Sequence, residues 1–254
     1  VTRLGDSNNY VDLLGKKAEI NAGRDLLVQA GENFVQLASD VRAHNIDMDV
    51  AKNVEIGAQA LASRSHSEYY SEEESGYSTS HSVRHARSSM VATGSVNIKS
   101  GHDFALLGSG IKAAGDVDVK AGGKVSVLSL IDEDHRETYT EEEDGFWSNS
   151  ESIDHNSTHE EHLVKPSIAA GGNLGVVSGD KQTYLGADVA SGGKTKFAAP
   201  KIEFLVGITH SSNSSSSSDR DLLWQSSESS GSSSKSVHET SLLSEGSLVL
   251  DAKQ

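Results

Sequence analysis

The chain repeats one pattern three times. The segment 94–130 has a counterpart upstream at 23–60 and another downstream at 172–208, and each copy is followed by a stretch rich in Ser, Glu and His. A repeat of this length restricts the fold to a solenoid, a propeller or a similar array before any single residue is considered. It also argues against an enzyme, because repetition spreads residues evenly where an active site concentrates unlike ones.

Short stretches inside each copy alternate apolar and polar residues, as in 46–50, 96–98 and 117–119. A period of two is typical of strands with one buried face, and helical periodicity is missing. Glycine pairs and Gly-Asp steps precede most of these stretches. We expect these glycines to supply positive φ at tight corners. The sequence therefore predicts an all-β chain.

A shorter repeat of about 21 residues, the length of one solenoid coil, runs inside each copy, so that Gly94 corresponds to Gly115 and Gly101 to Gly122. A β-sandwich does not have a sequence repeat of about 21 residues, and propeller blades are about 40 residues long with aromatic signatures. This chain is only 5% aromatic. We predict a right-handed parallel β-helix, the hand being the default for parallel crossovers. Residues 1–254 are expected to form a single β-helical fragment of a larger protein, because the chain starts without a leader and stops within the pattern.

The pattern breaks after every second coil, at about residues 64–90, 132–163 and 209–244. Insertions at one phase of a solenoid emerge from one face, which is often the binding face. We expect three protruding β-hairpins or loops, with Tyr77 and Phe146 near two of the tips; the alternative is solvated low-complexity arms without a partner. Candidate partner-binding residues are the aromatic side chains of these insertions: Tyr77, Phe146, Trp147 and Trp224.

Nine of the eleven histidines fall in the insertions. The tightest group is His155, His159 and His162, which on a helix could share one face and bind zinc. The surrounding serines and acids give no sign of a helix, so these three are weak candidates, and we predict no metal site and no cofactor. The acidic runs 72–74 and 141–144 lack the spacing of a calcium loop. Histidines clustered among glutamates could instead change charge near about pH 6.

Charge and composition exclude several classes of function. A net charge of −15 makes a nucleic-acid backbone an improbable partner and disfavours attraction to an anionic membrane surface. The chain has no cysteine, so disulfides cannot stabilise it. No nucleophile, metalloprotease or phosphate-binding motif is present, and carboxylate pairs such as Asp47 and Asp49 are typical of outward positions on amphipathic strands. We therefore expect no catalytic residues.

The coils, for example AAGDVDVKAGGKVSVLS at 113–129, resemble the haemagglutinin repeats of filamentous haemagglutinin and of contact-dependent growth inhibition effectors, over about residues 22–253. The resemblance implies a secreted or cell-surface bacterial exoprotein that leaves the cell through an outer-membrane transporter of the two-partner type. The Ser/Glu-rich arms are similar to the effector region that associates with a target cell's outer membrane to pass a toxin inward.

Three functions remain open. The resemblance favours a non-enzymatic delivery segment whose partner is the target-cell outer membrane or a surface receptor. The second is an adhesin stalk that binds host or bacterial surfaces. The third is a polysaccharide-cleaving β-helix, against which the scarcity of aromatic residues in the coils argues.

Overall fold

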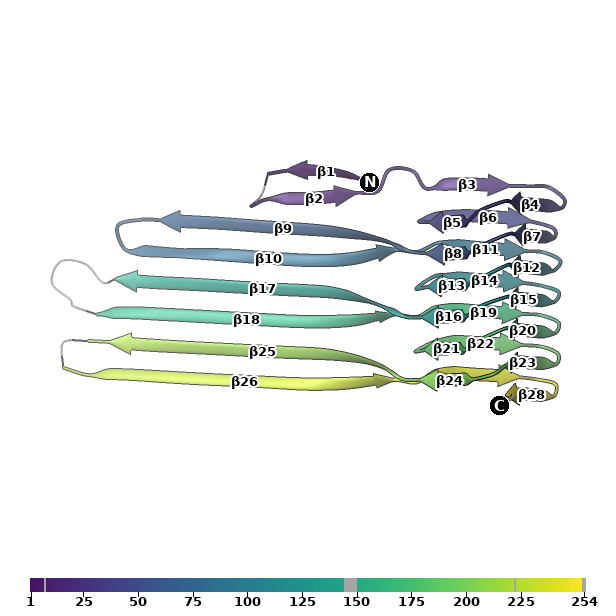
Figure 1. Cartoon of the computed structure of the whole chain (residues 1–254). Helices are drawn as coiled ribbons and strands as arrows, with labels where there is room; N and C mark the ends of the chain where they lie inside the picture. The colour runs from purple at the N-terminus through teal and green to yellow at the C-terminus, as the bar shows by residue number, and fades with distance from the viewer. Residues whose placement is uncertain (7, 144–149, 222, 253–254) are drawn as a thin grey trace.

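The computed structural model describes residues 1–254 except 7, 144–149, 222 and 253–254. The described residues form strands and turns, without a helix. They build two bodies, a rod of stacked coils and a flat antiparallel sheet that extends from one side of it (Figure 1). The predicted all-β fold is confirmed.

Three parallel sheets form the rod, and each of the first six coils contributes one strand to each of them, whereas the last coil contributes strands to the first two sheets. The first contains β3 (Ala18–Asn21), β6 (Ser39–Ala43), β11 (Ser89–Ala92), β14 (Gly110–Ala113), β19 (Ser167–Ala170), β22 (Asp188–Ser191) and β27 (Ser241–Ser244). The second contains β4 (Leu26–Ala30), β7 (Ile46–Val50), β12 (Val96–Ser100), β15 (Val117–Ala121), β20 (Leu174–Ser178), β23 (Thr195–Ala199) and β28 (Leu248–Ala252). The third contains β5 (Phe34–Leu37), β8 (Val54–Gly57), β13 (Phe104–Leu107), β16 (Val125–Leu128), β21 (Gln182–Leu185) and β24 (Ile202–Leu205).

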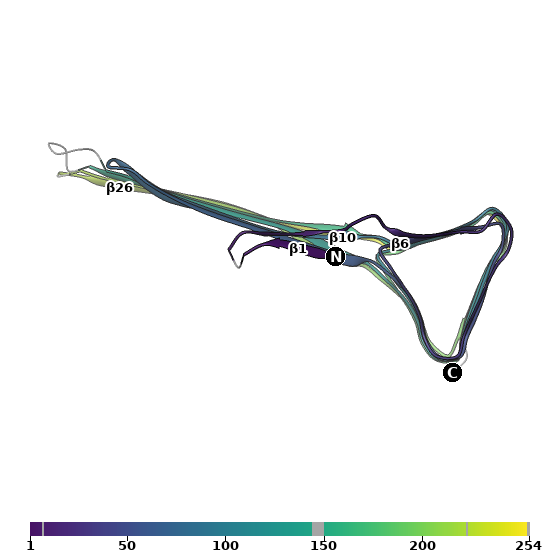
Figure 2. The same ribbon diagram turned by 90° about the horizontal axis from the view of Figure 1, so that it is seen from above.

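The coils stack in register. Val96 pairs with Val117, which is 21 residues further along the chain, as the repeat predicts. Seen from above, the chain runs clockwise from β3 through β4 to β5 while it descends from the N-terminal end, so the coil is right-handed (Figure 2). The predicted right-handed parallel β-helix is therefore confirmed.

The alternating residues of each strand build the core in columns. Ile98, Val119 and Val176 occupy paired positions of β12, β15 and β20 and are each 0% exposed. Burying one such side chain stabilises the fold by about 1.5–3 kcal/mol. The core of the rod therefore comes from the apolar half of the period-two pattern, while the polar half faces solvent.

The corner glycines differ from the prediction. The described residues with positive φ are Gly5, Ala38, Gly108 and Gly186. Gly115 and Gly122 are not among them. A Cβ on Gly122 would instead lie 2.1 Å from the carbonyl oxygen of Gly101 in the preceding coil. Lack of space between stacked coils, rather than positive φ, requires glycine at this corner.

Polar side chains connect successive coils at two corners. The Oδ1 atom of Asn53 accepts a hydrogen bond from the backbone N–H of Asp103 (3.1 Å), and Asp103 Oδ1 accepts one from the backbone N–H of Lys124 (2.7 Å). Asn173 Oδ1 accepts one from Lys194 at another corner (2.9 Å). Backbone N–H groups at the corners, outside the strand ladders, are thus hydrogen-bonded to side-chain oxygens of the preceding coil.

Each insertion is a long antiparallel hairpin. The three hairpins are β9 (Gln59–Tyr70) with β10 (Glu74–Ala86), β17 (Leu130–Glu143) with β18 (Glu151–Val164), and β25 (Gly207–Arg220) with β26 (Gln225–His238). A short hairpin of β1 (Thr2–Gly5) and β2 (Tyr10–Leu13) precedes them. All eight strands form one sheet in the order β1-β2-β9-β10-β17-β18-β25-β26, which we call the hairpin sheet.

Strand spacing explains why a hairpin leaves the rod after every second coil. A hairpin adds two strands to its sheet, and two coils add two strands to each sheet of the rod, at the same spacing of about 4.8 Å. Neighbouring hairpins therefore meet edge to edge, β10 with β17 and β18 with β25 (Figure 1). One hairpin per coil would crowd the sheet, and one per three coils would leave gaps.

The hairpins leave at the corner between the third and first sheets. In the alternate coils this corner is a tight turn with positive φ: 45° at Ala38, 56° at Gly108 and 54° at Gly186. In the other coils the chain passes from β8, β16 and β24 into a hairpin. One corner thus alternates between a left-handed turn and a hairpin.

The hairpins differ from the predicted insertions at their ends. The first ends at Ala86 rather than near 90, and the third at His238 rather than near 244. Met90 lies in β11 and is 1% exposed, and Leu242 in β27 packs against the core. The serine-rich sequence around these residues is similar to the arms, but its apolar side chains point into the rod. All three hairpins also begin earlier than predicted, at Gln59, Leu130 and Gly207.

Candidate interaction surface

The hairpin sheet has two chemically different faces. Residues paired across it lie on the same face, and alternate residues of a strand lie on opposite faces. One face, the histidine face, contains the paired rows Glu68–Tyr77–Tyr139–His155, His66–Thr79–Glu137–Ser157 and Arg64–His81–His135–His159. The other, the serine face, contains the intervening rows, such as Ser67–Ser78–Thr138–Asn156 and Ser65–Ser80–Arg136–Thr158.

Imidazole and carboxylate groups alternate on the histidine face. His155 Nε2 lies 2.9 Å from Glu137 Oε1, and His66 Nε2 lies 2.9 Å from Glu68 Oε1. His159 lies between two carboxylates, at 3.6 Å from Glu133 and 3.5 Å from Glu161 on the strands of the same hairpin. Each of these contacts therefore brings a basic imidazole against an acidic carboxylate.

Tyr77 lies within a small network on this face. Its ring stacks on that of Tyr139, with centroids 5.5 Å apart, and its hydroxyl donates to Glu137 Oε1 at 2.9 Å. The hydrogen bond from Tyr77 to the Glu137 carboxylate raises the pKa of Tyr77. The hydrogen bonds from His155 and Tyr77 lower the pKa of Glu137. The network therefore favours the neutral phenol and the charged carboxylate.

Carboxylates join neighbouring hairpins at their bases, where the paired rows end. Glu161 Oε2 accepts from the backbone N–H of His210 (2.8 Å) and lies 3.1 Å from its Nδ1, and these contacts lower the pKa of Glu161. Asp132 Oδ1 makes the same two contacts to His85, at 2.8 and 2.9 Å. Asp12 accepts a backbone hydrogen bond from β9 in the first junction (3.1 Å). All three junctions thus end in a carboxylate that accepts a backbone N–H, and in two of them the carboxylate also contacts an imidazole.

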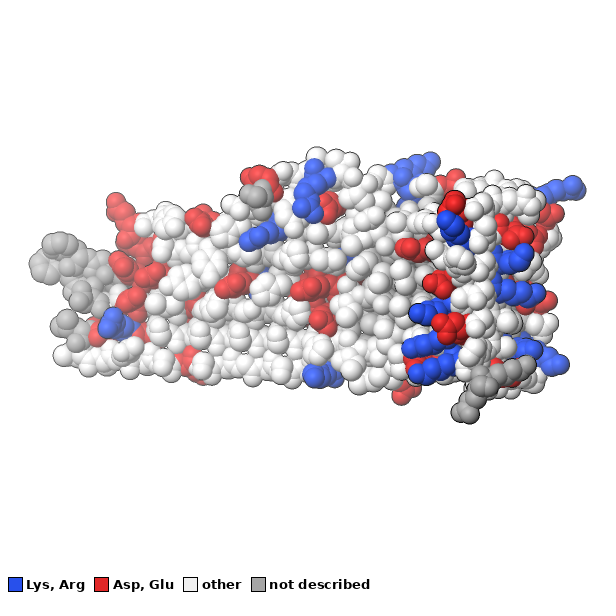
Figure 3. All heavy atoms as spheres, in the orientation of Figure 1, with Lys and Arg blue, Asp and Glu red and all other residues white. Residues whose placement is uncertain are grey.

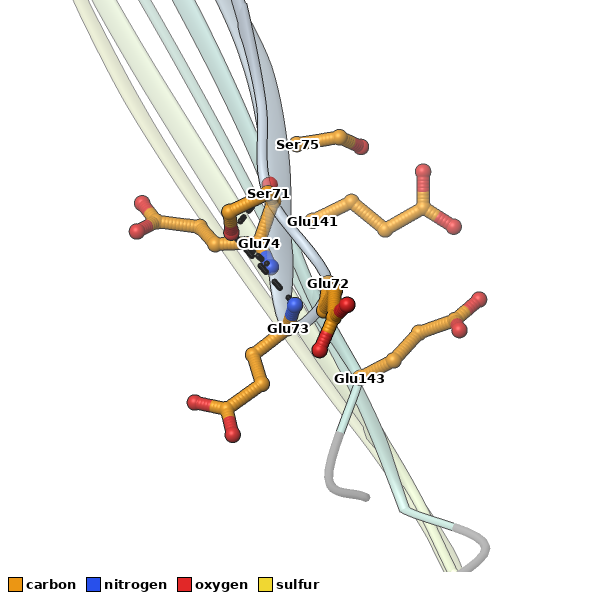
Figure 4. A pocket seen from close by; sticks show the side chains of 7 residues that line it. All are labelled: Ser71, Glu72, Glu73, Glu74, Ser75, Glu141 and Glu143. Carbon is orange, nitrogen blue, oxygen red and sulfur yellow. Dashed lines mark hydrogen bonds between the residues drawn. The ribbon is translucent and has the colours of Figure 1, made fainter. Parts of the chain in front are cut away.

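Acidic side chains also gather near the tip of the first hairpin, around a shallow hollow of about 180 Å³. In Figure 4, Glu73 and Glu74 point to one side, and Glu141 and Glu143 point to the other. Among the residues that the structure describes, no group of three or more His, Cys, Asp or Glu is placed to hold a metal ion. These carboxylates diverge as solvated like charges do.

The weak zinc candidates do not converge. His155, His159 and His162 lie in β18, a strand rather than a helix. His155 and His159 share the histidine face but are four residues apart, about 13 Å along a strand. His162 pairs with Asp132 and, being three residues from His159, lies on the serine face, 3.7 Å from Glu160.

Of the candidate partner-binding aromatics, the two that the structure describes, Tyr77 and Trp224, lie on different hairpins. Tyr77 lies in β10, three residues past the turn at residues 71–74 that ends the first hairpin. Trp224 is at the tip of the third hairpin, 54% exposed, and lines a shallow hollow of about 410 Å³ with Arg220 and Glu151. Phe146 and Trp147 lie outside the described residues.

Sequence reasoning missed Tyr139 and Glu137, which complete the Tyr77 network. Both are on the neighbouring hairpin, so the network appears only once β10 is paired with β17. The alternating pattern of 133–141, with Glu, His, Glu, Tyr and Glu at every second position, was the available signal. It predicts that these side chains share a face if the segment is a strand.

The net charge of the chain resides in the hairpins. The spans 59–86, 130–164 and 207–238 contain 19 acidic and 5 basic residues, a net charge of −14 out of −15. Lys and Arg side chains gather mostly over the rod, and the third hairpin shows few charges (Figure 3). The negative charge of the chain is therefore concentrated on the hairpin sheet.

Residues 70–145 match the family model of the hemagglutinin repeat. The match runs from the end of β9 through β10 and the third and fourth coils to the end of β17, which is less than a third of the chain. It supports a filamentous-haemagglutinin-type repeat, a structural repeat of adhesins rather than an enzyme family. The chain matches no curated protein and no solved structure. None of the described segments is a helix able to cross a membrane.

Proposed function

We propose that this chain is a non-enzymatic segment of a large secreted bacterial exoprotein, in which the rod sets position and the hairpin sheet contacts a neighbouring cell. The observation that carries the proposal is the hairpin sheet itself, a continuous surface without a covering layer that holds nearly all of the net charge. The hemagglutinin-repeat match supports a secreted, adhesin-like β-helix.

The specific activity that we propose is contact-dependent toxin delivery, with the hairpin sheet engaging the outer membrane or a surface receptor of the target cell. An outer-membrane transporter would export the parent protein. Two features support this activity: the hairpins are spaced so that they form one surface, and that surface differs between its faces.

An adhesin stalk is the second candidate, and the continuous core of the rod favours it. Buried side chains follow one another from coil to coil through β7, β12, β15, β20 and β23. A rod of this kind resists bending and suits a spacer. In this second candidate the hairpins bind host or bacterial surfaces or have no partner.

The decisive variant removes the hairpins and keeps the rod. The variant lacks residues 59–87, 130–165 and 207–239, so that each coil follows the previous one without an insertion. After the first deletion, the paired residues Ile46 and Val96 are separated by 21 positions in the sequence, as Val96 and Val117 are. Each new corner needs glycine at its first position, where Gly108 and Gly186 adopt positive φ in uninterrupted coils. The variant therefore includes Ala58→Gly, Ser129→Gly and Val206→Gly.

Binding of the labelled chain to bacterial cells, measured by flow cytometry, tests the proposal. We expect the hairpin-free variant to keep its β-sheet circular dichroism and lose cell binding. The matched control lacks residues 96–173, so its rod is two coils shorter. It keeps the first and third hairpins, which are still two coils apart. Cell binding that persists without hairpins would refute the proposal, and failure of every form to bind would favour a pure spacer.

A further inference from the structure

Histidines are distributed unequally between the faces of the hairpin sheet. Strand alternation and pairing place two on the serine face, His162 and His238. Six are on the histidine face: His66, His81, His135, His155, His159 and His210. A seventh, His85, lies at the base of the sheet beside Asp132. Because histidine is the side chain whose charge changes between about pH 5 and 8, the faces respond differently to acid.

The other charged groups on each face determine its net charge when the histidines are neutral. The histidine face carries Asp12, Glu68, Glu133, Glu137, Glu141, Glu143, Glu151 and Glu161 with Arg3, Arg64, Arg220 and Lys235, a net charge of −4 with neutral histidines. The serine face carries Glu74, Asp132, Asp134, Glu142, Asp154, Glu160, Asp219 and Glu228 with Arg84 and Arg136, a net charge of −6.

Protonation of the histidines reverses the sign of only one face. Full protonation of its six histidines takes the histidine face from −4 to +2, whereas full protonation of its two histidines takes the serine face from −6 to −4. The pKa values of Tyr77 and Tyr139 are raised, so these two phenols stay neutral in this range. Charged ends on opposite faces of one sheet are separated by about 10 Å, which is about one Debye length at 0.1 M salt. Each face therefore presents its own charge to a flat partner.

The positive charge in acid is concentrated in one row. Arg64, His81, His135 and His159 are paired in succession across β9, β10, β17 and β18. Directly paired residues lie about 5 Å apart, and the row crosses the sheet near its middle. Glu133 and Glu161 contact only the last of these four.

We propose that the histidine face docks on an anionic lipid surface in mild acid and is repelled from it at neutral pH. This inference rests on the proposed function, because it specifies the condition under which the hairpin sheet engages a target membrane. The occupant follows from charge complementarity: a flat face that turns positive fits a flat array of phosphate headgroups. The net negative charge of the chain then prevents docking at neutral pH rather than at every pH.

Vesicle co-sedimentation of the whole chain tests the inference. The probes are vesicles of phosphatidylglycerol with phosphatidylethanolamine, and vesicles of phosphatidylcholine alone, each at pH 5.0 and 7.5 in 0.1 M salt. We expect binding only to the anionic vesicles at pH 5.0. Each cationic side chain near an anionic surface strengthens partitioning by about fivefold, so His81→Asn, His135→Asn and His159→Asn together should weaken it by roughly a hundredfold.

The opposite face provides the matched control. The double variant His162→Asn with His238→Asn removes histidines from the serine face and should bind as the unaltered chain does. Equal binding at the two pH values, binding to phosphatidylcholine vesicles at pH 5.0, or an equal loss in the serine-face variant would overturn the inference. Circular dichroism at pH 5.0 establishes that each variant is folded. If only the vesicle result fails while hairpin removal still abolishes cell binding, the proposed function stands and the acid-dependent docking does not.

Discussion

Alanine at position 108 tests the alternation between left-handed corners and hairpin exits. Gly108 has φ of 56° and occupies the corner that precedes β14. A Cβ there would lie 2.9 Å from Leu130 Cδ1 and 3.3 Å from Val164 Cγ1, both at the base of the second hairpin. Gly108→Ala would therefore strain the corner and press on the hairpin base.

Two opposing terms set the size of the effect. A left-handed conformation costs a non-glycine residue about 1–2 kcal/mol. Removing the glycine restricts the unfolded chain, which offsets about 0.4–1 kcal/mol. With displacement of Leu130 added, we expect a net loss of about 1–2 kcal/mol in the free energy of unfolding. For a chain of this size that lowers Tm by about 2–4 °C.

Thermal and urea unfolding followed by circular dichroism measure this loss, with Gly110→Ala as the control. Gly110 lies two residues further on, has no positive φ, and a Cβ there meets only the movable hydroxyl of Ser167 at 3.0 Å. Ala38→Gly, at the equivalent corner with φ of 45°, should gain about 0.5 kcal/mol. Equal losses for Gly108→Ala and Gly110→Ala would refute the reasoning.

Three further variants test other parts of the structure. Phe104→Ala empties a fully buried position and should cost about 3–5 kcal/mol in urea unfolding; a loss below about 1 kcal/mol would contradict the packed core. Asn53→Ala breaks a connection between coils and should cost about 1 kcal/mol, whereas Asn97→Ala, on the exposed side of β12, should cost almost nothing. Glu161 has a lowered pKa, so its contribution is present above its unfolded pKa of about 4.3 and is lost as pH falls through the lower folded value. Glu161→Gln should therefore destabilise by about 1 kcal/mol at pH 7 and flatten the fall of stability between about pH 5 and 3, as measured by Tm against pH.

Periodicity made the rod predictable from the sequence. The 21-residue echo and the inward apolar residues at 96, 98, 117 and 119 specify stacked coils, because each coil can bury its apolar face only against its neighbours. The reason assigned to the corner glycines was wrong, since carbonyl oxygens of adjacent coils cannot be read from local sequence. Met90 was placed outside the rod for a similar reason: its serine-rich neighbours hide the alternation.

The candidate site was predictable only in part. The alternation of side chains along a strand predicts that Tyr139 and Glu137 lie on one face. Their contact with Tyr77 depends on the pairing of two hairpins that are separated by two coils. The zinc suggestion for His155, His159 and His162 assumed helical spacing, and a strand places His162 on the opposite face. Long-range register, rather than local propensity, determines which side chains meet on the hairpin sheet.

The equal spacing of coils and hairpin strands has a mechanical consequence. Strands of both bodies lie across the rod, so their inter-strand hydrogen bonds run along its length (Figure 1). A pull from end to end is then carried by four ladders side by side where hairpins adjoin, and not by three. The hairpin sheet therefore shares the tension, and load passes from one hairpin to the next through the ladders of β10 with β17 and of β18 with β25. The backbone contacts of Asp132 and Glu161 extend these two ladders at the base of the sheet.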